Sequence, residues 1–195
     1  MLYILYPSMD DEELVTEGAN LDARAIVKKA KKEFTQNLKL CKKEIKAKNY
    51  KEAKSYTKKM KASLKDYESQ IKKLESTVGS VILGYFATSL RDLCNLTVVT
   101  LDTKVAAKTT NPAAKVALHT AGTVGGLLIA PVSMIKALIT SVEEIMGLIK
   151  GIQEEKNLPD KINFYKQKML TILGKLMKVV DDMDKLIDKK AAEDK

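Results

Sequence analysis

The fold is decided by residues 162–187, INFYKQKMLTILGKLMKVVDDMDKLI, near the end of the 195-residue chain. Apolar side chains recur there three, four, four, three, four, three and four residues apart, at Ile162, Tyr165, Met169, Leu173, Leu176, Val180, Met183 and Ile187. This spacing puts them on one face of a helix and predicts a heptad seam that packs against another helix. The pattern allows two packing partners for this helix, an amphipathic helix of the same molecule or another copy of the chain.

A second pair of stripes lies in residues 22–76. The first follows a helix cap at Asn20 or Asp22 and consists of Ile26, Ala30, Phe34, Leu38, Cys41 and Ile45. It breaks at Lys48-Asn49 and resumes at Tyr50, Ala53, Tyr56, Met60, Leu64, Tyr67, Ile71 and Leu74. Two helices of about 25 residues on either side of a tight turn fold back into an antiparallel hairpin roughly 40 Å long, because mutual burial removes both stripes from water.

The centre of the chain is apolar. Residues 77–101 surround an Arg91-Asp92 pair with large apolar side chains, Val78 and Val81 among them, and predict a helix buried on most faces. Residues 97–110 are an extended segment or a loop, and Asn111-Pro112 is a suitable start for the next helix. Residues 132–152 predict another helix, whose charged residues lie on a face of their own, at Lys136, Glu143, Glu144 and Lys150.

Residues 116–135 carry no formal charge over twenty positions. This length allows two interpretations, a buried helix of a soluble bundle or a membrane span. Gly122 and Gly126 permit two helix backbones to approach closely in either setting, so they do not decide between the two.

These patterns predict an all-α fold, an elongated helical bundle with a long antiparallel N-terminal hairpin, an apolar central helix pair and a C-terminal heptad helix. We expect residues 1–21 to form an acidic extended arm and residues 22–76 a basic helical hairpin. Residues 77–195 hold the central helices and the C-terminal amphipathic helix, and they form one cooperative unit with the hairpin. The composition agrees, since 30% charged and only 5% aromatic residues favour long, surface-rich helices.

The net charge of +9 is unevenly distributed. Residues 1–21 hold five acids and no base, residues 22–75 hold eighteen bases against seven acids, and the rest is nearly balanced, with sixteen bases against thirteen acids. The basic segment predicts a non-specific contact with polyanions. Lysine outnumbers arginine seventeen to one there, which argues against bidentate reading of bases. The lysines expected to make this contact are Lys28, Lys29, Lys31, Lys32, Lys42, Lys43, Lys58 and Lys59.

Catalytic chemistry is not indicated, and we expect no catalytic, cofactor-binding or metal-binding residue and no cofactor. His119 is the single histidine, so it has no second histidine with which to share acid–base or metal chemistry. Asp181, Asp182 and Asp184 are expected to be solvated. Cys41 and Cys94 are far apart and predict buried free thiols.

The first third of the chain resembles a known class of proteins. The stretch VTEGANLDARAIVKKAKKEF, residues 15–34, with KNYKEA at residues 48–53, resembles small helical virion structural proteins of large tailed bacteriophages. Val15-Thr16-Glu17-Gly18 is also similar to the aliphatic-x-Glu-small sites cut by the prohead proteases of such phages, with Val where Leu or Ile is more usual. The resemblance implies a structural role in a capsid, tail or baseplate.

The leading hypothesis is therefore a non-enzymatic structural or assembly protein of a virion, in contact with other virion proteins or with copies of itself. It would reside in the virion, or in the cytoplasm of the infected cell before assembly. The apolar run at residues 1–6 lacks a basic flank and precedes Pro7 and an acidic cluster, which is unlike a signal peptide. One alternative is a membrane-active, pore-forming type of helical protein that inserts the apolar centre, residues 78–152. Another is a non-specific nucleic-acid packaging protein.

Overall fold

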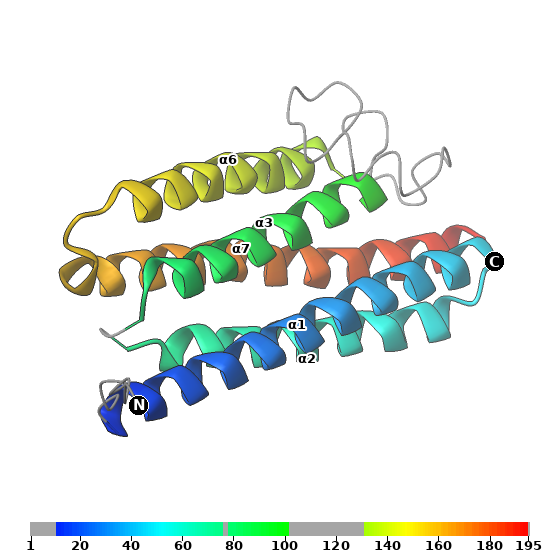
Figure 1. The fold of residues 1–195 in the computed structure, drawn as a ribbon. Coiled ribbons are helices and arrows are strands. Elements are labelled where there is room, and N and C mark those ends of the chain that lie inside the picture. The colour runs from blue at the N-terminus through cyan, green and yellow to red at the C-terminus, as the bar shows by residue number, and fades with distance from the viewer. Residues whose placement is uncertain (1–10, 76–77, 102–130, 195) are drawn as a thin grey trace, which may run out of the picture.

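The chain is a bundle of long helices in a computed structural model that describes residues 11–75, 78–101 and 131–194 (Figure 1). Within these ranges the helices are α1 (Asp11–Lys46), α2 (Tyr50–Lys73), α3 (Ser80–Leu101), α6 (Val132–Glu154) and α7 (Leu158–Glu193). The described residues contain no strand. The prediction of an all-α fold is confirmed.

The helices are stacked in three levels along a common long axis. Figure 1 shows the α1–α2 hairpin on one side, α3 and α7 in the middle, and α6 on the opposite side. The main pairs in contact are α1 with α2 and α3, α7 with α2, α3 and α6, and α3 with α6. With 36 residues each, α1 and α7 are about 54 Å long and set the length of the molecule.

The seam of α7 is buried along its whole length. All eight of its predicted apolar positions, from Ile162 to Ile187, are no more than 5% exposed. The mate is α2 of the same chain, which runs antiparallel to α7, and α6 covers an adjoining side. The open choice of partner is thereby settled in favour of the same molecule, and one apolar core joins all five described helices.

The hairpin turn closes at Lys48, the one described non-glycine residue with positive φ, at 60°. The amide N–H of Asn49 donates to the carbonyl oxygen of Glu44 (2.9 Å), and that of Lys48 donates to Ile45 (3.1 Å). This pair of bonds is a Schellman motif, which ends α1 and satisfies two of its last carbonyl groups. At the other end of α2, the Lys166 ammonium donates to the carbonyl oxygen of Leu74 (2.6 Å), where a cation complements the helix dipole.

Several boundaries and positions differ from the predictions. α1 begins at Asp11, so the cap expected at Asn20 or Asp22 is wrong. The extended arm predicted over residues 1–21 is wrong from residue 11 onward, and residues 1–10 lie outside the described ranges. Acids in the first turns of a helix interact favourably with its dipole, and this favours helix over an extended arm.

The central segment also departs from expectation at its ends. α3 begins at Ser80 and continues to Leu101, so residues 97–101 are helical and not a loop. Val81 of α3 is 70% exposed. Ile26 of α1 is 38% exposed, because the inward face of α1 passes through Val27 instead. Helix α6 agrees with the helix predicted over residues 132–152, with its charged residues exposed. Asn111-Pro112, His119, Gly122, Gly126 and residues 116–130 lie outside the described residues. Pro131 is the N-cap residue of α6, and residues 132–135 form its start.

We predict that Lys48→Gly stabilises the protein by about 0.5–1 kcal/mol, because glycine adopts the left-handed conformation without the steric cost of a Cβ. The ion pair that the variant loses, Lys48 with Asp194 at 3.5 Å, contributes little because the lysine side chain is 70% exposed. Urea denaturation followed by circular dichroism measures the change.

The matched control is Lys39→Gly, at an exposed position inside α1, which should instead cost about 1 kcal/mol. Destabilisation by both glycine variants to the same extent would contradict the turn geometry.

Candidate interaction surfaces

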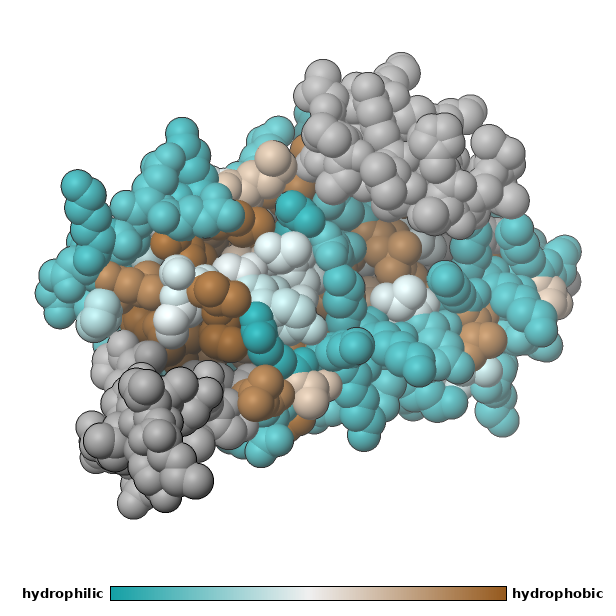
Figure 2. All heavy atoms as spheres, viewed as in Figure 1, coloured by the Kyte–Doolittle hydropathy of each residue, from teal (hydrophilic) through white to brown (hydrophobic). Residues whose placement is uncertain are grey.

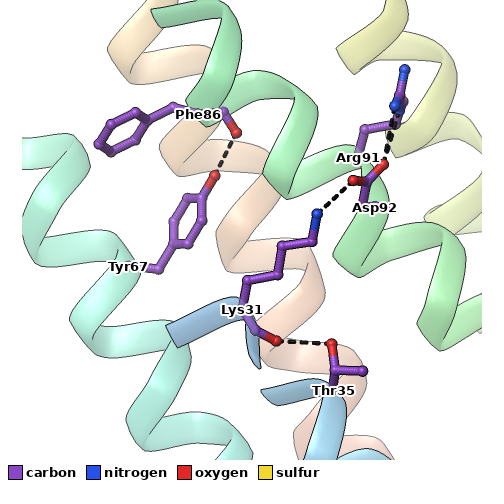
Figure 3. A network of polar contacts seen from close by, with 6 residues as sticks. All are labelled: Lys31, Thr35, Tyr67, Phe86, Arg91 and Asp92. Carbon is purple, nitrogen blue, oxygen red and sulfur yellow. Dashed lines mark hydrogen bonds and ion pairs between the residues drawn. The ribbon is translucent and has the colours of Figure 1, made fainter. Parts of the chain in front are cut away.

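One lysine of the hairpin, Lys31, makes its contact inside the molecule. The ammonium of Lys31 donates to Asp92 of α3 at 2.6 Å, and Arg91 contacts the other carboxylate oxygen of Asp92 at 3.0 Å. Figure 3 shows this cluster beside the Tyr67 hydroxyl, which donates to the carbonyl oxygen of Phe86. The predicted surface contact at Lys31 is therefore replaced by a contact between α1 and α3.

A second set of ion pairs borders the seam between α2 and α7. Lys54 contacts Asp188 at 2.6 Å and Asp184 at 3.7 Å, and Lys61 pairs with Asp181. The hydrogen bond to Asp188 is the main reason that the pKa of Lys54 is raised. Asp181 is 50% exposed, in line with the expectation that it is solvated, and it also pairs with Lys61. The expectation is wrong for Asp184, whose side chain is only 24% exposed, because charges that flank an apolar seam meet across it.

The hydroxyl of Thr57 adds a bond at the same seam. It is fully buried and donates to Asp184 at 2.5 Å. Asp182, which points away from α2, pairs instead with Lys185 of its own helix at 3.0 Å. Single exposed pairs of this kind contribute about 0–1 kcal/mol each, so their main effect is to fix the register of α2 against α7.

The other predicted lysines remain on the outside of the hairpin. Lys29 is close to Glu33 (3.9 Å) and Lys59 lies over the ring of Tyr56 (4.7 Å). Lys42 is half-buried, and burial followed by repulsion from Lys46 lowers its pKa. The remaining four are exposed and have no ion pair with a described residue: Lys28, Lys32, Lys43 and Lys58.

These exposed lysines belong to two longitudinal stripes. The α1 stripe consists of Lys28, Lys32, Lys39 and Lys43, and the α2 stripe consists of Lys51, Lys58, Lys65 and Lys72, all of them exposed. Spacings of four, seven and four on α1, and of seven throughout on α2, keep each stripe on one face of its helix. The same spacings are visible in the sequence, which could therefore also have predicted Lys39, Lys51, Lys65 and Lys72 as part of the basic contact surface.

A groove between α6 and α7 is the feature that sequence reasoning missed. Its volume is about 620 Å³, and an apolar floor lies between basic side chains. The floor includes Pro131, Met134, Ala137, Val179 and Leu186, and the basic rim consists of Lys175, Lys178, Lys185 and Lys189. The charge of residues 76–195 is nearly balanced as a total, which conceals a local concentration of lysine on one face of α7.

The two thiols are buried, as predicted. Burial raises the pKa of Cys41 to about 12, with a smaller contribution from Asp184. Burial likewise raises the pKa of Cys94 to about 12, against an opposing effect of Lys175. Both groups are therefore held as neutral thiols, which are poor nucleophiles and poor metal ligands.

Two further properties concern the described residues only. They hold no group of three or more histidine, cysteine or acidic side chains arranged to bind a metal ion. None of the described helices combines the length and the apolar character that crossing a membrane requires. Comparisons with protein families, curated proteins and solved structures gave no match to this chain.

The stability of the protein should fall as pH rises through the alkaline range. Both thiols have pKa values near 12 in the folded protein, whereas unfolded thiols ionise near pH 8.5, so the unfolded state loses protons first. Between about pH 8 and pH 10 the free energy of unfolding should decrease by roughly 2 kcal/mol for each thiol. Urea denaturation at a series of pH values measures this slope.

The control is the double variant Cys41→Ala, Cys94→Ala, which lacks both groups and should lose clearly less stability over the same range. An identical slope in the two proteins would mean that the thiols ionise equally in the folded and unfolded states.

Proposed function

We propose that this chain is a non-enzymatic structural and assembly protein, a bacteriophage virion component that makes protein–protein contacts in a capsid, tail or baseplate. The observation that carries the proposal is the pair of lysine stripes on the outer faces of α1 and α2. Support for the phage context comes from the resemblance of residues 15–34 to virion proteins, a stretch that lies entirely in α1.

The stripes are suited to docking because the helices that carry them are held rigidly. Lys31, Lys54 and Lys61 anchor the hairpin to α3 and α7 through ion pairs. The α1 stripe then presents charges over about 22 Å and the α2 stripe over about 32 Å, at the fixed rise of an α-helix. Such a pattern is complementary to an acidic protein surface of similar length.

The energetics favour a repeated contact over a single one. An exposed lysine–carboxylate pair is worth about 0–1 kcal/mol, so a single copy would bind an acidic surface weakly. When many copies are held in one particle, the contacts act together and the avidity rises by orders of magnitude without new chemistry. This is the setting of a virion component. The seam of α7, by contrast, is buried in its own chain, so contacts through α7 use its outer face.

Reversing the charge of the hairpin should abolish incorporation into particles. In the variant Lys28→Glu, Lys32→Glu, Lys43→Glu, Lys58→Glu, four exposed lysines become acids, while none of the ion pairs described above is broken. We expect an unchanged circular dichroism spectrum and urea midpoint, together with loss of the chain from particles purified by density gradient. Antibody detection across the gradient measures this loss.

The control variant changes charge equally on α6, α7 and the connection between them: Lys136→Glu, Lys156→Glu, Lys161→Glu, Lys168→Glu. It should enter particles as the wild type does. A chain that remains a strict monomer in gel filtration and mass photometry, and sediments apart from every particle, contradicts the proposal. Salt-sensitive binding to DNA by the same chain would favour the packaging alternative, and flotation with liposomes would favour the membrane-active one.

A further inference from the structure

We propose that the groove between α6 and α7 binds the acidic N-terminal segment, residues 1–21, of a second copy and so joins copies head to tail. The inference rests on the proposed assembly function and adds to it a specific interface of the chain with itself.

The groove offers an apolar floor between cations. Met134, Val179 and Leu186 contribute to the floor. On the rim, Lys178 is exposed and makes no ion pair with a described residue, whereas Lys185 is 77% exposed and contacts only Asp182 of its own helix. Lys175 pairs with Glu144 at 3.0 Å and Lys189 with Glu193 at 3.8 Å, so Lys178 is the rim lysine without an ion pair to a described residue. The lining holds four lysines and one acid, and the ligand that fits it is an anionic segment with apolar side chains.

The N-terminal segment has this composition. Residues 1–6 read MLYILY, and residues 10–13 read DDEE, with a further acid at Glu17 and no base before residue 22. Large apolar side chains and five carboxylates therefore lie within 21 residues. No other 21-residue stretch of the chain joins a run of six apolar residues to five acids without a base.

Within one molecule the acids and the groove are far apart. The 35 steps from Asp11 to Lys46 along α1 measure about 52 Å. Lys48 contacts Asp194, so the C-terminal end of α7 lies beside the Lys46 end of α1. Lys175, the groove lysine farthest from that end, is about 28 Å back along α7, which leaves about 24 Å between it and Asp11 along the bundle axis.

The acids that belong to α1 therefore cannot reach the groove of their own chain. Figure 1 shows the same separation, with the start of α1 at one end of the bundle and the start of α6 near the other, on the opposite side. A contact of Asp11, Glu12 or Glu13 with the groove must therefore join two copies. The contact joins two different surfaces, so two bound copies still have one free segment and one free groove between them. Further copies can therefore add, and the assembly extends.

Complementary charge reversal tests the pairing in the full-length chain. The groove variant is Lys178→Glu, Lys185→Glu, and the segment variant is Asp11→Lys, Glu12→Lys, Glu13→Lys. Sedimentation velocity over a range of concentrations at low salt should show self-association of the wild type, weakened roughly tenfold or more in each variant. An equimolar mixture of the two variants should associate again, because each supplies the surface that the other lacks.

The matched control is Lys161→Glu, Lys168→Glu, which makes the same change with the same spacing on the other half of α7. It should associate as the wild type does. Circular dichroism of every variant confirms folding. Loss of association in the groove variant alone, with the segment variant unaffected, would overturn the inference by pointing to another occupant.

Association that survives both reversals would also overturn it, while leaving the proposed assembly function in place. The hairpin variant and the mixture of groove and segment variants test different claims. If the hairpin variant fails to enter particles while the mixture still associates, the role of the hairpin lysines in assembly is separated from the head-to-tail contact. A strictly monomeric wild type at all concentrations overturns the head-to-tail contact directly.

Discussion

The burial of the α7 seam against α2 of the same chain is the constraint on which the rest of the structure depends. Eight apolar side chains over about 38 Å of helix cannot stay in water, and a 36-residue helix of this kind must find a mate. The mate is internal, and it runs antiparallel with Lys54 and Lys61 facing the acids of α7. Because α7 also contacts α3 and α6, the same helix holds the hairpin and the central helices in one core.

This use of the apolar stripes decides what remains outside. Acids of α7 pair with Lys54 and Lys61 at the seam and do not neutralise the lysines farther out, so the outer faces of α1 and α2 carry an excess of positive charge. On the face drawn in Figure 2, hydrophilic residues border hydrophobic ones that show between the helices. The few large apolar side chains exposed among the described residues, such as Val81 and Phe164, are scattered along different helices. The surface therefore favours contacts through charge, and the groove beside α7 is where charge and apolar surface meet.

Periodicity predicted the helices and nearly all of their buried faces, because a spacing of three and four residues reflects burial directly. Periodicity gave wrong helix boundaries where burial does not determine the local structure. The start of α1 at Asp11 depends on the helix dipole and on helix propensity, and the end of α3 at Leu101 falls in a Thr- and Val-rich stretch whose composition suits several conformations. The hairpin lysines were identified from composition, but which of them are paired depends on Asp92, Asp181 and Asp188, far away in sequence. The groove could not be predicted, since it requires the register of α6 against α7.

The most direct test of the internal seam is a short cross-link between α2 and α7. In a Lys61→Cys, Asp181→Cys variant, the introduced thiols occupy partly exposed positions, whereas Cys41 and Cys94 are buried and held neutral. Treatment of the dilute protein with a short bismaleimide, followed by mass spectrometry of the denatured chains, reports which thiols are joined. The account predicts a cross-link within single chains, at monomer mass. Cross-links found only between chains, at dimer mass, would show that the seam of α7 belongs to another copy and would contradict it.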